Sequence, residues 1–265
     1  MNRMSRATRV LWGLVTVVGL PIVLLAIWWF TTADSTNPYV PPLRNIFGAF
    51  PDTWTTGRLS SDVVPSVVRL LVGYLAAVVL GVALGVAVGG SRTLRGYLEP
   101  VLEFLRAVPP PVIVPILILF AGIGNTMKVL VIVSGCVWPV LLNTVEGVRG
   151  VDEVLADTAR CYRISGIRRL RQLVLRSASP QIVTGMRQAL SLGLILMVIS
   201  EMFAASNGLG YSIVQFQRSF AIPQMWTGII VLGVIGIVLA GIFRLFERRA
   251  LAWYLGLRES RRGSG

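Results

Sequence analysis

The side chains best suited to chemistry lie in one polar segment, Thr144 to Ser179, between long apolar stretches. The segment carries seven arginines and four acidic residues, namely Arg149, Arg160, Arg163, Arg168, Arg169, Arg171, Arg176, Glu146, Asp152, Glu153 and Asp157. Guanidinium groups bind carboxylates and phosphates through paired hydrogen bonds. Connections of this length are uncommon and usually functional. We therefore expect the polar segment to be a docking surface.

Apolar residues recur along the polar segment with the period of a helix. The first helical face, at positions i, i+3, i+4, i+7 and i+11, is formed by Val151, Val154, Leu155, Thr158 and Tyr162. A turn at Ser165 and Gly166 is followed by a second face, formed by Ile167, Leu170, Leu173 and Val174. The segment is therefore predicted to form two short amphipathic helices with a bend between them. Such helices either dock on a protein or lie on anionic lipid, and the pattern alone favours neither.

The rest of the sequence offers little that could catalyse a reaction. It contains no histidine, and its one lysine, Lys128, is not part of the Gly-x-x-x-x-Gly-Lys-Ser/Thr motif that holds nucleotide phosphates. Its two cysteines, Cys136 and Cys161, are too few for a disulfide framework or a cysteine-ligated metal site. We therefore expect no enzyme activity, no metal and no cofactor on this chain itself.

The composition is that of a membrane protein. Of 265 residues, 54% are hydrophobic and only 14% are charged, which is more apolar than a soluble domain requires. Five apolar runs are long enough to cross about 30 Å of hydrocarbon as helices, at residues 10–30, 65–90, 126–143, 181–205 and 226–243. A sixth run, 98–123, is interrupted by charges and by Pro109, Pro110, Pro111 and Pro115. The predicted fold class is an all-α polytopic membrane protein with about six transmembrane helices.

The basic residues alternate with the apolar runs instead of forming one patch. With the N-terminus in the cytoplasm, eighteen of the 25 basic residues lie on the cytoplasmic side. This asymmetry satisfies the positive-inside rule, so both termini are predicted to be cytoplasmic. It also argues against nucleic-acid binding, despite the net charge of +13, because phosphate-binding charge forms a continuous surface. The run Val10 to Phe30 is longer than the core of a secretory signal and is expected to remain as the first span.

A few polar residues fall inside the apolar runs, where charge is costly and tends to mark a pathway or a buried pair. The candidates for a substrate pathway are Arg106, Trp138, Arg187, Gln188, Ser200 and Glu201. Arg69 is a further charge at membrane depth. Two interpretations remain open. Either these residues line a translocation cavity beside the proline-broken span, or they form internal ion pairs and packing contacts.

Five short motifs give a more specific indication of family. They are Leu105–Pro110, Gly122–Gly124, Pro139–Thr144, Thr184–Arg187 and Asn207–Tyr211. Their order and spacing, over about residues 63–250, resemble the membrane-spanning permease subunit of ATP-binding-cassette (ABC) importers. Within that family, the chain is similar to the branch that includes nitrate, taurine and aliphatic-sulfonate permeases.

The resemblance implies a type I ABC importer permease fold that forms the pathway for a small solute. It divides the chain into an N-terminal helix with an extracytoplasmic loop (1–62), a permease core (63–250) and a cytoplasmic tail (251–265). The implied partners are ABC ATPase subunits that bind ATP and Mg, an extracytoplasmic solute-binding protein, and a second permease chain, identical or different. The implied location is the bacterial cytoplasmic membrane. An ion-coupled secondary transporter is the alternative, with Glu201 and Glu103 as its coupling carboxylates.

In the resembling family, the polar segment (144–179) is the coupling loop, whose short helix sits in a groove of the ATPase. The family's Glu-Ala-Ala triplet matches Asp157-Thr158-Ala159, but Arg163 stands at the expected glycine and Leu175-Arg176 replaces a Leu-Pro pair. The coupling residues implied by this match are Asp157, Thr158, Ala159, Arg160, Cys161, Tyr162, Arg163, Ile164 and Gly166. Since the nearest glycine is Gly166, we expect docking to be retained and the bend to be shifted or altered.

Overall fold

The computed structural model describes residues 6–256 except 36, 56, 204 and 255. For residues 6–18 it describes the backbone alone. Every regular element in this part of the chain is a helix, as predicted. The predicted cytoplasmic tail, 251–265, lies mostly outside the described residues. The chain divides into two compact units, one of residues 1–59 and 213–230 and the other of residues 60–212 and 231–265.

The first unit joins the N-terminal segment to a segment much later in the chain. It contains α1 (Arg6–Thr31), α2 (Leu43–Trp54), the end of α10 (Leu209–Arg218) and the start of α11 (Ile222–Ala250). The ring of Trp28 meets that of Trp226 edge to face, with centroids 5.0 Å apart. The indole nitrogen of Trp54 donates to the hydroxyl of Thr227 at 2.9 Å. Tryptophan contacts, those of buried Trp54 and of half-buried Trp28 and Trp226, therefore fasten the N-terminal helices to the start of α11.

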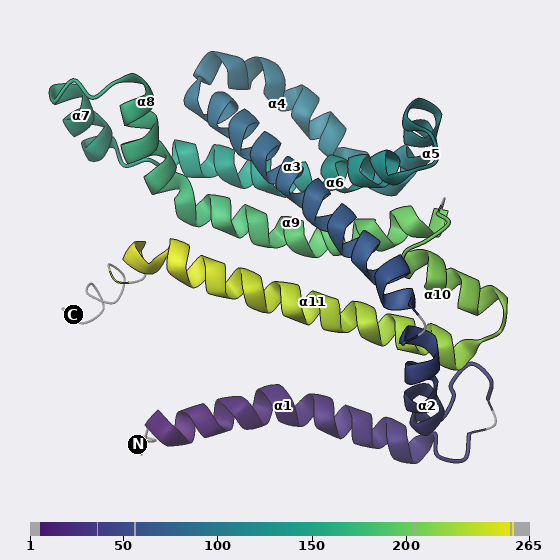
Figure 1. The fold of residues 1–265 in the computed structure, drawn as a ribbon. Helices are drawn as coiled ribbons and strands as arrows, with labels where there is room; N and C mark the ends of the chain where they lie inside the picture. Colours follow the sequence, from purple (N-terminus) through teal and green to yellow (C-terminus); the bar gives the residue numbers. More distant parts are fainter. Residues whose placement is uncertain (1–5, 36, 56, 204, 255, 257–265) are drawn as a thin grey trace. The chain divides into compact units, whose positions relative to one another are not determined.

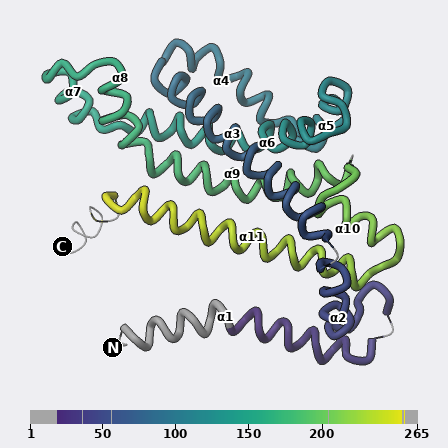
Figure 2. The backbone as a smooth tube through the Cα atoms, in the orientation of Figure 1, coloured from purple at the N-terminus to yellow at the C-terminus, as the bar shows by residue number. Residues whose placement is uncertain are grey.

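The core of the second unit is a bundle of three long helices (Figures 1 and 2). They are α3 (Val64–Gly90), which follows a π-helical turn at Leu59–Val63, α6 (Asn125–Arg149) and α9 (Leu175–Phe203). α6 packs along both of the other helices. Their shared interior is mostly aliphatic, with Leu70, Ile132 and Leu196 at its centre. The part of α11 in this unit is joined to α9 by an ion pair between Arg187 and Glu247.

Glycines let α3 approach α6 closely. Gly81 and Gly85 lie about one turn apart on the face of α3 that meets α6. A Cβ atom at Gly85 would lie 2.5 Å from the Cβ of Thr144, and one at Gly81 would lie 2.7 Å from the Cβ of Val140. Because real Cβ atoms do not come so close, only small residues permit this spacing between the two helices.

The interrupted run at 98–123 forms a bent pair of helices. α4 (Arg92–Ala107) and α5 (Pro110–Ala121) meet at 92°. Pro109 has an extended backbone between them. A proline at the first position of α5 costs no hydrogen bond, because that backbone position has no acceptor within the helix. The proline run therefore turns the chain sharply where the sequence predicts a broken span.

The described residues contain four helices that are long and apolar enough to cross a membrane. They are Leu59–Gly90, Asn125–Arg149, Gly166–Phe203 and Ile222–Ala250. The bent pair counts as a fifth span if its two helices cross together. The predicted first span is helical as α1, but the side chains of residues 6–18 lie outside the description. Its membrane crossing, and the side on which the termini lie, stay predictions.

The polar segment forms one separate helix, α7 (Glu153–Cys161), where periodicity predicts two. Asp152 caps α7 by accepting a hydrogen bond from the backbone NH of Leu155 at 3.1 Å. The second predicted helix is continuous with the next span. α8 (Gly166–Arg169), a π-helical turn (Leu170–Val174) and α9 make up one helix of 38 residues. This helix begins well before the predicted apolar run at 181–205, and Pro180 lies inside it without ending it.

We expect Gly85→Ala to destabilise the protein by about 1 to 3 kcal/mol, because the added Cβ forces α3 and α6 apart. Gly90→Ala, in the same helix, is the matched control, since no atom lies within 4 Å of its added Cβ. Thermal unfolding of the detergent-purified variants measures both effects. Equal midpoints for the two variants would contradict the close approach of α3 and α6.

Candidate functional site

A buried ion pair joins α3 to α9 near one end of the second unit. Arg69 Nη1 donates to Glu201 Oε1 at 2.7 Å, and the two side chains are only 4% and 0% exposed. The hydroxyl of Ser66, about one turn before Arg69, lies 2.7 Å from the same carboxylate oxygen. Burying charge is costly unless the polar atoms around it find partners. The surroundings of this pair therefore decide whether it stabilises the fold.

The remaining donors of Arg69 reach two further segments. Nε donates to Asn125 Oδ1 at 2.8 Å, at the start of α6. Nη2 donates to Asn207 Oδ1 at 2.6 Å, in the turn after α9. A planar guanidinium with five fixed donors suits this position better than an ammonium group would. Arg69 therefore ties α3, α6, α9 and the following turn together.

The backbone of the turn at 207–210 is held by the same cluster. The NH of Gly208 donates to Asp62 Oδ1, in the turn before α3, at 3.2 Å. The NH of Leu209 donates to Ser66 Oγ of α3 at 2.9 Å, and the NH of Gly210 donates to Glu201 Oε2 of α9 at 3.0 Å. Gly208 has φ +123°, and a Cβ there would lie 2.5 Å from Glu201 Cδ. Glycine is therefore required at this position for two independent reasons. Since α10 begins at Leu209, the cluster also fixes the start of that helix.

Two more charged residues belong to this buried cluster. Asp62 is 6% exposed and accepts a hydrogen bond from the hydroxyl of Ser212 at 2.8 Å. Lys128, on α6, is 3% exposed and interacts electrostatically with Arg69 and Glu201. These four charged residues supply two acidic and two basic groups, and the opposite charges lower the cost of burying each other.

Sequence reasoning singled out Arg69 and Glu201 but not Asp62, Asn125 or Lys128. The one signal for them was the turn motif at 207–211. A glycine-rich turn that begins a new helix leaves the first NH groups of that helix without helical acceptors, and these need other partners. The motif could therefore have pointed to carboxylates elsewhere in the chain, although not to particular ones.

Three of the predicted pathway residues meet at a cavity of about 360 Å³. Arg106 comes from the end of α4, Trp138 from the middle of α6 and Gln188 from α9. Asn143 donates to the side-chain oxygen of Gln188 at 3.2 Å. Glu103 pairs with Arg106 at 2.6 Å. The cavity thus combines a guanidinium group, two amides and an aromatic ring.

The other three predicted pathway residues lie elsewhere. Arg187 forms its ion pair with Glu247 of α11. Ser200 is fully buried and donates to the carbonyl of Met197 at 2.8 Å. Glu201 belongs to the buried cluster. These side chains make the internal pairs and packing contacts of the second interpretation and do not line the cavity at Arg106.

α7 leaves its apolar side chains uncovered. Val154, Leu155 and Tyr162 are 72%, 51% and 77% exposed, and Ala159 is the buried residue of this helix. Apolar side chains that gather on one exposed surface mark a place where another molecule binds. Most of the helical face predicted from the sequence is therefore exposed within the part of the chain that the structure describes.

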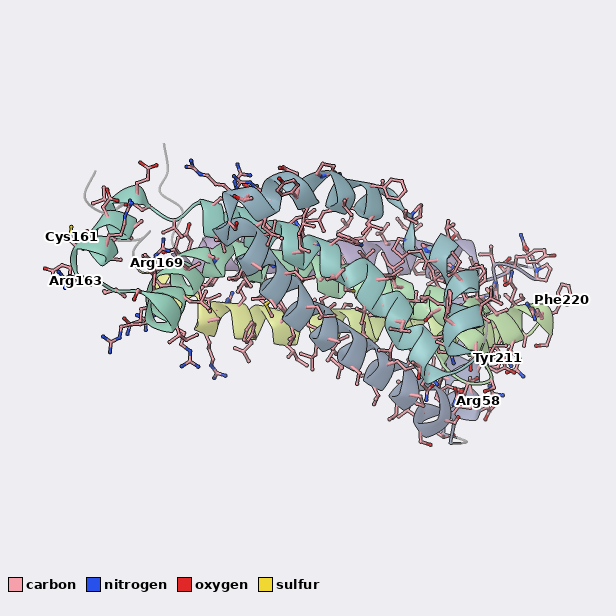
Figure 3. The ribbon with its side chains drawn as sticks, turned by 90° about the horizontal axis from the view of Figure 1, so that it is seen from above. Arg58, Cys161, Arg163, Arg169, Tyr211 and Phe220 are labelled. Atoms are coloured by element: carbon pink, nitrogen blue, oxygen red, sulfur yellow. The ribbon has the colours of Figure 1, made fainter. Side chains whose placement is uncertain are left out.

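The predicted coupling residues lie far from the buried cluster. Figure 3 shows Cys161 and Arg163 at one end of the second unit and Tyr211, next in sequence to the clustered turn, at the opposite end. Asp157 and Arg160 pair with each other on the exposed surface of α7. The predicted docking residues and the buried cluster thus lie at opposite ends of the second unit.

The bend after α7 contains two left-handed residues, Arg163 with φ 50° and Gly166 with φ 56°. The NH of Arg163 donates to the carbonyl of Arg160 at 2.9 Å, and the NH of Ile164 donates to that of Ala159 at 2.8 Å. This pair of bonds is the Schellman pattern that closes a helix, with Arg163 at the position that glycine usually takes. The expected glycine position therefore keeps its left-handed backbone, and Gly166 adds a second left-handed residue.

These features define the class of protein. A cavity lined by polar side chains lies where α4 and α5 meet the long helices α6 and α9, and a helix with exposed apolar side chains stands in the loop between two spans, as in a multi-pass membrane transport subunit. The chain belongs to the family described as the binding-protein-dependent transport system inner membrane component, whose model matches residues 77–251.

Two relatives extend this match over most of the chain. The putative aliphatic sulfonates transport permease protein SsuC of Bacillus subtilis (strain 168) is 30% identical over 236 residues, 88% of this chain and 86% of the relative. The taurine transport system permease protein TauC of Escherichia coli (strain K12) is 31% identical over 244 residues, 89% of each chain. The predicted family branch, permease function and inner-membrane location are confirmed.

A solved structure shows the same fold. A chain of the MetNI methionine ABC transporter, in inward-facing conformations, matches with a TM-score of 0.63 and 15% identity, covering 74% of this chain and 97% of that chain. The predicted type I ABC importer permease fold is thereby confirmed. No finding favours the ion-coupled secondary transporter.

We expect Glu201→Gln to destabilise the protein by about 3 to 5 kcal/mol, because it leaves Arg69 buried without its counter-charge. Glu146→Gln is the control: it removes a carboxylate from an ion pair whose side chains are 47% and 64% exposed, where we expect about 1 kcal/mol or less. Thermal unfolding in detergent compares the two. If both variants unfold at the same temperature, the buried cluster does not stabilise the protein.

Proposed function

We propose that this chain and a second permease chain form the translocation pathway of an ATP-driven importer for a small organic anion of the sulfonate class. The observation that carries the proposal is the uncovered apolar face of α7, at the opposite end of the second unit from the buried cluster. The cavity at Arg106, Trp138 and Gln188 supplies the pathway. The similarity to sulfonate and taurine permeases indicates the solute.

ATP hydrolysis is assigned to separate ATPase subunits, which bind ATP and Mg, because this sequence has no phosphate-binding loop. α7 suits a helix-in-groove contact with such a subunit. Its exposed Val154 and Leu155 would enter an apolar groove, and Arg160 and Arg163 would reach acidic groups at the rim. Residues 157–166 then serve as the coupling surface.

A continuous helix connects the proposed ATPase contact to the cavity. It runs from Gly166, at the bend after α7, to Phe203, and it carries Gln188 in the cavity wall. Packed helices move as rigid elements, so a displacement of α7 would shift this wall. Closure of two ATPase subunits on ATP would then turn the cavity outward to accept solute, and hydrolysis would reset it.

The cavity suits a small organic anion. Arg106 offers charge-assisted hydrogen bonds to an oxyanion, and Gln188, whose side-chain oxygen accepts from Asn143, offers its amide NH groups. Trp138 offers an apolar surface to the carbon part of the solute. A volume of about 360 Å³ is in the range of small-molecule sites. A separate extracytoplasmic binding protein would deliver the solute and set most of the specificity.

The second permease chain is either a copy of this one or a different chain. α5 exposes Leu119 and Phe120 at 84% and 87%, an apolar surface that lipid or a second permease would cover. The mass and composition of the complex purified after expression from its own gene cluster distinguish a homodimer from a heterodimer.

We expect replacement of residues 157–163 by a flexible Gly/Ser segment to abolish uptake and the stimulation of ATPase activity, because the docking helix loses its second half. A single charge on the uncovered face, Leu155→Glu, should weaken ATPase binding at least tenfold. Glu153→Gln, two residues away and outside the predicted apolar face, is the control. Co-purification and uptake into proteoliposomes measure both effects, and normal uptake in the Gly/Ser variant would refute the coupling role.

We expect Arg106→Gln to lower sulfonate uptake by about 10- to 100-fold, the factor that corresponds to losing one hydrogen bond to a charged group. Glu103→Gln breaks the same ion pair but leaves the guanidinium in the cavity, so uptake should change little. Uptake of labelled taurine by proteoliposomes, with the amount of assembled complex held equal, measures this difference. Equal uptake by the two variants would contradict a role for Arg106 in solute transport.

A further inference from the structure

A larger cavity lies where the long helices of the second unit end. It has a volume of about 650 Å³ and is lined by the last turn of α3, the start of α4, the end of α6 and the segment around the bend after α7. No carboxylate is among the described residues that line it. The cavity shares Gly166 with the proposed coupling surface (157–166), but neither that surface nor the translocation pathway accounts for the arginines that line it.

Four arginines line it: Arg92 and Arg95 from α4, Arg149 from α6 and Arg169 from α8. Arg149 pairs with Glu146 at 2.8 Å. For the other three, the described part of the chain provides no ion pair. Like charges around one cavity repel each other. A bound anion would remove that repulsion and use the free guanidinium donors.

The position of the cavity indicates the source of the anion. Val86 and Val148, in its wall, belong to the last turns of α3 and α6, two membrane-spanning helices. The cavity therefore lies at the level where hydrocarbon gives way to water, which is the level of phospholipid head groups. Arginine binds phosphate through two parallel hydrogen bonds. Basic pockets between the ends of membrane-spanning helices are also a known form of head-group site.

We propose that this cavity binds the phosphodiester head group of an anionic phospholipid, held by Arg92, Arg95 and Arg169. The valines of the wall face the glycerol and the first acyl carbons. The bound lipid joins the start of α4 to the helix that follows the bend after α7. Lipid binding at this site needs a membrane but no ATPase, so it can be tested separately from the proposed ATPase contact.

The test uses the full-length protein, exchanged into nanodiscs that contain equal amounts of phosphatidylglycerol and phosphatidylcholine. Native mass spectrometry then counts the phosphatidylglycerol molecules that stay bound after release from the nanodisc. The variant Arg92→Gln, Arg95→Gln, Arg169→Gln should bind this lipid on the order of 100-fold more weakly, about fivefold for each arginine. The matched control, Arg168→Gln, Arg171→Gln, Arg176→Gln, removes the same charge from exposed positions outside the cavity and should keep the lipid.

A second measurement on the wild-type protein does not depend on the variants folding. A photoactivatable phosphatidylglycerol should crosslink to peptides that cover residues 86–95 and 148–174. Equal lipid retention by the two triple variants, or crosslinks only to other peptides, would overturn the proposal. So would full displacement of the lipid by millimolar inorganic phosphate, which would indicate a site for a free anion. Loss of a co-purifying ATPase with unchanged lipid would instead assign the arginines to a protein partner.

Discussion

The ion pair between Arg69 and Glu201 is the contact on which the arrangement of the second unit depends. A buried pair stabilises a fold only when its other donors and acceptors are satisfied, and here the partners come from Ser66 of α3, the start of α6, the turn after α9 and the start of α10. Each partner is a side chain or backbone group of a different segment. The three long helices and the start of α10 are therefore fixed relative to one another at this end.

Fixing one end has a consequence for movement at the other. α9 is held by Glu201 near its C-terminal end and is continuous at its N-terminal end with the bend after α7. A displacement of α7 would therefore tilt this helix about the buried cluster, and Gln188, between the two ends, would move with it. The π-helical turn at Leu170–Val174 lies between the bend and the cavity. Single π-helical turns inside a helix are frequent at functional sites, and this one leaves the helix continuous from the bend to the cavity wall.

The sequence predicts the helices of this fold well and their contacts poorly. Run length alone locates the long spans, because about 20 apolar residues are needed to cross a bilayer. The buried cluster could not be foreseen, since its members lie as far apart as Asp62 and Ser212, and periodicity identifies a helix face without identifying what it meets. For the same reason, the sequence left open whether Glu201 lines a pathway or forms an internal ion pair, and only the structure shows its partner, Arg69. Periodicity also failed to show that α8 continues into α9. It identifies apolar faces, and it does not show whether the helix continues between two of them.

The bend after α7 explains how a motif can lose its glycine and keep its geometry. The bonds from the NH groups of Arg163 and Ile164 to the carbonyls of Arg160 and Ala159 require a left-handed residue at 163, whatever its side chain. Arginine adopts that backbone at a cost of about 1 to 2 kcal/mol relative to glycine, and the two hydrogen bonds are of similar magnitude. What differs from glycine is the exposed guanidinium that now projects from the bend. Arg163 therefore adds a charge to the proposed docking surface while the bend keeps a left-handed backbone, and a partner that fits this surface should carry an acidic group facing that position.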